Sequence, residues 1–189
     1  MKKLPGLIIF LIVIIFIAYN APNVYSADAK NVSEIQQLLQ SGFENARTGK
    51  LDAAINDFNK VISLDKKNAS AYAGLGNSYA QKGNPDKAIE YYNKAISLDD
   101  KNSFAYAGLG SSYAQKGNPD KAIEYYNKAI SLNSKNPFTY YSLGSLYSSL
   151  NRKDDALKML KILKDLNKNL ADNLERQMQK PNIPAKPGK

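Results

Sequence analysis

Residues Ala69–Asn102 have the sequence ASAYAGLGNSYAQKGNPDKAIEYYNKAISLDDKN, and Ser103–Asn136, directly after them, have the sequence SFAYAGLGSSYAQKGNPDKAIEYYNKAISLNSKN. Only five of the 34 positions differ between the two segments. The same register extends with weaker similarity over residues 35–68 before this pair and over 137–170 after it. Repetition at a fixed period of this length indicates a repeat architecture, in which each unit packs mainly against its neighbours.

Small residues recur at two positions of every unit. Position 8 is glycine and position 20 is alanine in all four units. Large residues, among them Phe58, Tyr92 and Tyr126 at position 24, recur between the small ones. Small residues opposite large ones allow two helices to interdigitate at native packing density. The structural positions predicted in this way are Gly42, Gly76, Gly110, Gly144, Ala54, Ala88, Ala122 and Ala156.

Each unit is predicted to contain two helices joined by a tight turn. In the second unit Tyr72, Leu75 and Tyr79 follow helical spacing and mark the apolar stripe of a first helix. Gly83 then suits the left-handed conformation that ends a helix. Asn84 is a favourable residue to cap the second helix, and the same turn is repeated in the third unit.

This pattern closely resembles the tetratricopeptide repeat family. The resemblance rests on the 34-residue period, on the aromatic-x-x-Leu-Gly-x-x-Tyr opening (Tyr72, Leu75, Gly76, Tyr79) and on the later Ala, Tyr and Ala. It implies an all-α fold: a right-handed α-solenoid of four helix-turn-helix repeats, 35–68, 69–102, 103–136 and 137–170. The proline usual near position 32 is missing, and the asparagines that close three units are expected to cap the next helix instead: Asn68, Asn102 and Asn136.

The segment after the fourth unit is predicted to close the solenoid. Leu170, Leu174 and Met178 lie at helical spacing with polar residues between them. This pattern is typical of the solvating end helix that a solenoid needs, so we expect a C-terminal capping helix over 171–179. Residues 180–189 are rich in proline and lysine, which predicts a disordered basic tail.

The N-terminus carries a targeting pattern. Lys2 and Lys3 precede Leu7–Ala18, an unbroken run of twelve apolar residues. Because spanning a bilayer takes about 20 residues, the run favours a signal peptide over 1–26, cleaved after Ser26 and followed by a linker over 27–34. The alternative is an uncleaved anchor over Leu4–Ala21. The first option predicts a secreted, periplasmic or envelope-exposed protein, and the second a single-pass membrane-anchored one.

Composition disfavours several function classes. The chain has no cysteine and no histidine, which excludes disulfides, zinc fingers and Cys- or His-based nucleophilic triads. Its net charge is +9, but residues 27–149 carry 14 basic and 12 acidic side chains, so the surplus lies near the ends and nucleic-acid binding is not expected. The carboxylates that recur at the start of each second helix are explained by helix capping: Asp52, Asp86, Asp120 and Asp154. We therefore expect no enzyme, no cofactor and no metal site.

The family resemblance implies a concave groove, lined by the first helix of each repeat, that binds a peptide or protein partner. The function expected is a scaffold or adaptor; the alternatives are a membrane-anchored assembly factor and a self-assembling module. Aromatic residues at position 2 either anchor a partner or pack on the preceding helix, whereas Tyr91 and Tyr125 are expected in surface or inter-repeat packing. The groove candidates are Phe43, Arg47, Asn77, Gln81, Phe104, Ser111, Gln115, Phe138, Tyr141 and Ser145.

Overall fold

The computed structural model describes residues 31–179, so the predicted signal peptide or anchor (1–26) and the basic tail (180–189) lie outside the described residues. A first helix covers residues 31–47 of the described part, and eight further helices follow it. They are α2 (Leu51–Leu64), α3 (Ala69–Gln81), α4 (Pro85–Leu98), α5 (Ser103–Gln115), α6 (Pro119–Leu132), α7 (Pro137–Ser149), α8 (Lys153–Leu166) and α9 (Lys168–Gln179).

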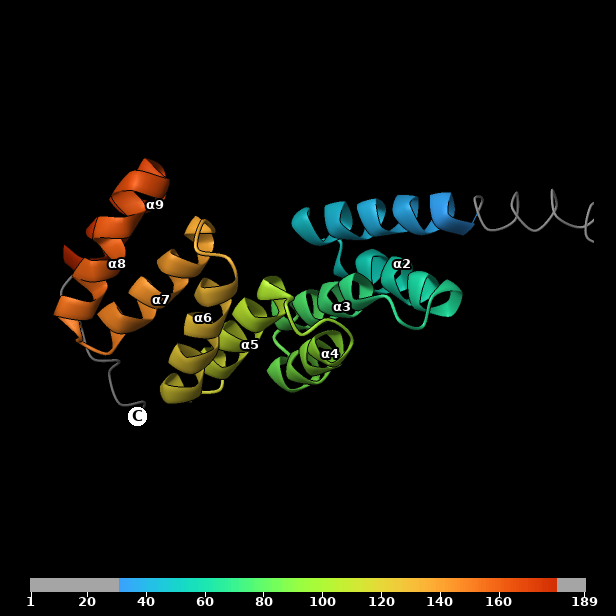
Figure 1. Cartoon of the computed structure of the whole chain (residues 1–189), viewed down its shortest axis with the longest axis horizontal. Helices are drawn as coiled ribbons and strands as arrows, with labels where there is room; N and C mark the ends of the chain where they lie inside the picture. Colours follow the sequence, from blue (N-terminus) through green and yellow to red (C-terminus); the bar gives the residue numbers. More distant parts are fainter. Residues whose placement is uncertain (1–30, 180–189) are drawn as a thin grey trace, which may run out of the picture.

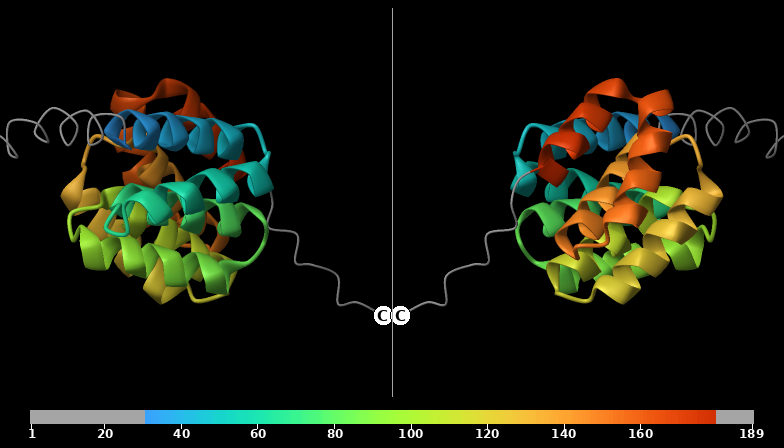
Figure 2. Two further views of the ribbon diagram at one scale, coloured as in Figure 1. Left: turned by 90° about the vertical axis from the view of Figure 1, so that its right-hand side faces the viewer. Right: turned by 90° about the vertical axis from the view of Figure 1, so that its left-hand side faces the viewer.

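The helices form antiparallel pairs that follow one another along the long axis of the molecule (Figure 1). The first helix and α2 form one end, and α8 and α9 form the other, as the two end-on views show (Figure 2). Residues 31–179 contain no strand. The predicted all-α solenoid with a C-terminal capping helix is confirmed.

The turn inside each pair has the predicted conformation. Gly49, Gly83 and Gly117 have φ of 78°, 75° and 72°, and Asn151 takes the equivalent place with φ of 58°. Asn84 then caps α4, because its side-chain oxygen accepts a hydrogen bond from the backbone N–H of Lys87 at 3.1 Å. The chain therefore reverses direction within a few residues, and each repeat becomes a compact helical hairpin.

The turns between repeats end on the expected asparagine caps. The side-chain oxygen of Asn68 accepts from the N–H of Ala71 at 3.1 Å, and that of Asn102 accepts from Ala105 at 3.0 Å. Asn136 accepts from Phe138 at 3.0 Å. Each cap satisfies a backbone donor that the first turn of a helix leaves without a partner. The asparagines thus cap these helices as predicted, in place of the missing prolines.

The core is organised around the large ring at position 24. The ring of Tyr92 lies between Gly76 of its own repeat and Gly108 of the next, and the ring of Phe58 lies likewise between Gly42 and Gly74. A Cβ atom on Gly76 would come within 2.7 Å of the Tyr92 ring, closer than real Cβ contacts. Position 8 therefore permits close helix approach as predicted, and the partner it accommodates is this ring. The four predicted alanines, including Ala88, are fully buried beside the rings.

The capping helix begins earlier than the predicted 171. It starts at Lys168 because Asn167 serves two helices: its N–H donates to the carbonyl of Leu163 at 2.7 Å, and its side-chain oxygen accepts from the N–H of Leu170 at 3.1 Å. No linker remains between α8 and α9. Leu174, fully buried, packs on Gly144 and covers the last repeat.

The predicted linker over 27–34 is wrong for its described part, since residues 31–34 belong to the first helix. No glycine or proline interrupts the sequence between residue 31 and Ile35, so the helix continues upstream although Val32 is exposed. None of the helices described between residues 31 and 179 combines the length and apolar character needed to cross a membrane.

Candidate functional site

A hollow of about 230 Å³ lies in the middle of the predicted groove; we call it the central hollow. The first helices of the second, third and fourth repeats, α3, α5 and α7, supply most of its lining. Six of the predicted groove residues meet there: Asn77, Gln81, Phe104, Ser111, Gln115 and Phe138. The periodic positions assigned from the family resemblance therefore converge in space.

The floor of the central hollow is made by two core tyrosines and a glycine. Tyr92 and Tyr126 line it from α4 and α6, and the Tyr92 ring packs directly against Gly108. Ser111 and Ser142 line the hollow together with Tyr126. Burial raises the pKa of both tyrosine hydroxyls, so the floor stays neutral over the physiological range.

A second hollow of about 270 Å³ adjoins the first toward the N-terminal repeats; we call it the side hollow. Its lining consists of Phe43, Ser70, Ala73, Asn102 and Phe104. Phe104 belongs to both hollows and forms the wall between them. The groove is therefore divided into two compartments by one aromatic side chain.

Of the two roles that the sequence left open for the position-2 aromatics, packing on the preceding helix is present for Phe104. The ring centroid of Phe104 lies 6.4 Å from that of Tyr92 on the preceding helix, in an edge-to-face arrangement. The Phe104 side chain nevertheless remains 44% exposed, and Phe138 is 65% exposed. Phe104 therefore packs on the preceding helix with part of its side chain exposed, and Phe138 is mostly exposed beside the central hollow.

Three predicted groove residues lie outside both hollows. Arg47 forms an ion pair with Glu44 at 2.7 Å, and this contact lowers the pKa of Glu44. Tyr141 packs against the core between the fourth repeat and α9. The Ser145 hydroxyl donates to the side-chain oxygen of Gln177 on α9 at 2.9 Å. The capping helix thus occupies the surface next to the end of the groove.

No charged side chain lines either hollow, and two ion pairs elsewhere link neighbouring repeats. Lys82 pairs with Asp52, and Lys116 pairs with Asp86 in the same geometry one repeat later. Helix capping alone, which the sequence suggested, therefore does not account for these carboxylates. No set of three or more metal-binding side chains gathers anywhere in residues 31–179.

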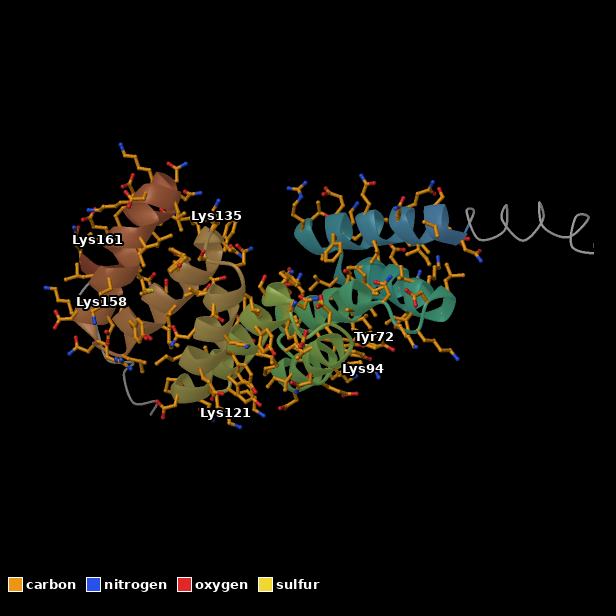
Figure 3. The ribbon with its side chains drawn as sticks, viewed as in Figure 1. Tyr72, Lys94, Lys121, Lys135, Lys158 and Lys161 are labelled. Carbon is orange, nitrogen blue, oxygen red and sulfur yellow. The ribbon has the colours of Figure 1, made fainter. Side chains whose placement is uncertain are left out.

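A column of tyrosines and lysines follows the seam between the two helices of the second repeat. Tyr79 stacks on Tyr91 at 5.3 Å between ring centroids, and the amino group of Lys87 lies 5.0 Å from the centroid of the Tyr79 ring. The amino group of Lys94 lies 5.9 Å from the centroid of the Tyr72 ring (Figure 3). The third repeat has the equivalent column. Tyr91 and Tyr125 each stack on a tyrosine of their own repeat, and each also packs beside a core cluster that includes the preceding repeat. The sequence signal that could have revealed this column is the recurrence of its tyrosines and lysines at the same positions of both repeats.

Three family models match the chain. One described as tetratricopeptide repeat covers residues 68–135, one described as TPR repeat covers 46–83, and another described as tetratricopeptide repeat covers 125–158. No curated protein sequence matches the chain.

Solved structures with the same fold include that of MamA, which is 31% identical with a TM-score of 0.60 over 80% of this chain and 86% of MamA. The thermophilic TPR protein TTC0263 of Thermus thermophilus has a TM-score of 0.71 at 20% identity, over 82% of this chain and 86% of its own. The first TPR of Spaghetti (RPAP3), bound to the HSP90 peptide SRMEEVD, has a TM-score of 0.57 at 20% identity, over 63% of this chain and 94% of its own. From the repeat models and the match to MamA, it follows that this chain belongs to the tetratricopeptide repeat family.

Proposed function

We propose that this chain is a non-catalytic scaffold that holds a segment of a protein partner in the groove formed by α3, α5 and α7. Tetratricopeptide repeat proteins are protein-interaction scaffolds, and the first TPR of RPAP3 was solved with a bound peptide. The observation that carries the proposal is the pair of exposed rings, Phe104 and Phe138, that border the central hollow. Aromatic side chains beside a pocket supply much of the binding energy at protein interfaces.

The groove also offers hydrogen-bond donors. The side-chain amides of Asn77, Gln81 and Gln115 line the central hollow together with the rings. A bound polypeptide presents backbone carbonyls, which need donors when water is removed. Apolar anchoring beside amide donors suits recognition of a polypeptide and supplies no titratable pair for acid–base chemistry.

The proposal includes export across a membrane. Its support is the basic Lys2 and Lys3 followed by the apolar run Leu7–Ala18, a pattern typical of signal peptides. The alternative is a membrane-anchored assembly factor that uses the same repeats. Cell fractionation with N-terminal sequencing separates the two, because a mature start at Ala27 supports export and an intact start at Met1 in the membrane fraction supports the anchor.

Affinity capture from the native host tests the groove. Phe104→Ala, Phe138→Ala and Asn77→Ala remove groove contacts, and each variant is checked for helical content before use. Leu157→Ala is the matched control, because Leu157 is an exposed apolar residue on α8 that lines neither hollow. We expect the groove variants to lose proteins that wild type and Leu157→Ala retain. Equal recovery by all variants would show that the groove is not the binding surface.

A further inference from the structure

We propose that the groove selects an uncharged, extended polypeptide segment with two bulky apolar side chains, one held on each side of Phe104. This inference rests on the proposed function and specifies its ligand. It comes from the division of the groove by Phe104 into the central and side hollows.

The size of each hollow suits a side chain. Pockets for drug-sized ligands occupy roughly 300–1,000 Å³. The central and side hollows, at about 230 and 270 Å³, are smaller than that range. Each is walled by phenylalanine: the side hollow lies between Phe43 and Phe104, and the central hollow includes Phe104 and Phe138. Two neighbouring compartments with aromatic walls fit two apolar side chains of one segment.

Small residues also line both hollows. Ser70 and Ala73 line the side hollow, and Ala107 and Gly108 line the central one. Such small residues leave depth for a leucine- or phenylalanine-sized group between the rings. A methyl group on Gly108 would meet the Tyr92 ring, so this ring packs directly on the backbone of α5.

The charge of the ligand follows from the lining. No Lys, Arg, Asp or Glu side chain lines either hollow. A charged side chain inserted there would lose its water without gaining an ionic partner, which is strongly unfavourable. The peptide SRMEEVD, bound by the first TPR of RPAP3, has three acidic side chains. We expect this groove to reject that peptide.

The backbone of the segment is held by amides at regular intervals. Asn102 lines the side hollow and Asn136 lines the central one. Their oxygens cap α5 and α7, and these caps leave the side-chain N–H groups available as donors. One amide beside each hollow matches a ligand that lies extended across both, with carbonyl groups facing the asparagines.

The test uses an array of synthetic ten-residue peptides and the purified mature chain. The host sequence consists of Gly, Ser and Asn and carries no leucine, one leucine, or two leucines. In the two-leucine peptides the second leucine lies one to five residues after the first (i+1 to i+5), and SRMEEVD is the acidic probe. Side chains two residues apart lie on the same side of an extended chain. We therefore expect even separations to bind more tightly than odd ones. The best two-leucine peptide should bind at least about tenfold more tightly than the one-leucine peptide, with Kd nearly independent of salt.

Phe104→Ala removes the wall between the hollows and is expected to erase most of the advantage of the second leucine. Leu157→Ala is expected to leave it unchanged. Tighter binding of SRMEEVD, or equal binding of one- and two-leucine peptides, overturns the inference. If the peptide binding seen in either of these two cases is lost in Phe138→Ala, the groove still holds peptides, and the proposed function stands without the further inference. Binding that survives both Phe104→Ala and Phe138→Ala, or no binding by any peptide, overturns the inference and the peptide-holding groove together.

Discussion

Gly108 shows how a single residue sets the spacing between repeats. It faces the ring of Tyr92 from the neighbouring repeat, and Gly76 faces the same ring from the other side. The fourth repeat has Ser142 in the place of Gly108, and Ser142 lines the central hollow together with Tyr126. At the junction of the third and fourth repeats a serine therefore takes the place at which the two earlier junctions pack a ring on a glycine.

Gly108→Ala is expected to destabilise the fold. In an open helix the change gains about 1 kcal/mol of helix propensity. Here the new methyl group must displace the buried Tyr92 ring, and overpacking of this kind costs roughly 1–3 kcal/mol. We predict a net loss in the free energy of unfolding, measured by urea denaturation. Tyr92→Leu in the same chain relieves the overlap, so the double variant should lose less than the sum of the two single changes. Additive losses would contradict this packing.

The buried tyrosines predict a loss of stability at alkaline pH. Burial raises the pKa of the hydroxyls of Tyr92 and Tyr126 above the ordinary value of 10.0. The unfolded chain then releases these protons at lower pH than the folded chain, so stability is complete below about pH 10 and declines as pH rises further. Tyr92→Phe should fold normally, since Phe58 holds the equivalent place in the first repeat, and should show a shallower decline. An unchanged pH profile of the urea midpoint would refute this.

At the scale of the element, each helix is defined by its own ends. Proline occupies the first turn of α4 and α6, an asparagine precedes each, and glycine with positive φ closes the helix before. These signals act within a few residues, so the turns of the second and third repeats form in the same way. This explains why the helix ends agree so closely with the sequence pattern. Lys50 and Arg152 precede α2 and α8 without a side-chain cap.

Asn84→Ala is expected to cost about 1 kcal/mol of stability, because the N–H of Lys87 loses its acceptor. Asn84→Asp keeps an acceptor at the positive end of α4 and should retain most of the stability. Asn93→Ala, an exposed change in the middle of the same helix, serves as the control. Urea midpoints of the three variants give the comparison. Equal losses at Asn84 and Asn93 would exclude a capping contribution.

At the scale of the whole molecule, the two ends of the solenoid differ. The C-terminal end is covered by α9, whose Ala171 and Leu174 are fully buried against the fourth repeat. The outer residues of α9 are polar, as a terminal solvating helix requires. Because Gln177 also bonds Ser145, α9 limits how far a ligand can extend along α7.

Truncation after Asn167 is expected to lower the thermal midpoint and to promote self-association. It removes the cover of Leu160, Leu163 and Tyr140, and an exposed solenoid end is an aggregation surface. Truncation after Gln179 is the matched control and should leave folding and partner binding intact. Light scattering and thermal denaturation measure both effects. A chain ending at Asn167 that stays monomeric and equally stable would show that α9 is dispensable.

Most of the fold was predictable because its signals are local or periodic. Gly83, Asn84 and Asn102 act on backbone groups within a few residues, and small residues at fixed positions define the packing. The pairs Lys82–Asp52 and Lys116–Asp86 were not predictable, since they join residues 30 positions apart whose approach depends on how repeats stack. The early start of α9 escaped prediction because one asparagine served two helices.

The sequence by itself determined the number of repeats, the helical hairpin of each and the groove positions, since a period of 34 residues repeats the same local physics four times. Only the tertiary structure decided which groove residues act together. It joined Phe104 to two hollows and placed Tyr141 and Ser145 beside α9. The reason is that the curvature of the stack and the position of its cap arise from contacts between repeats, which no single repeat contains.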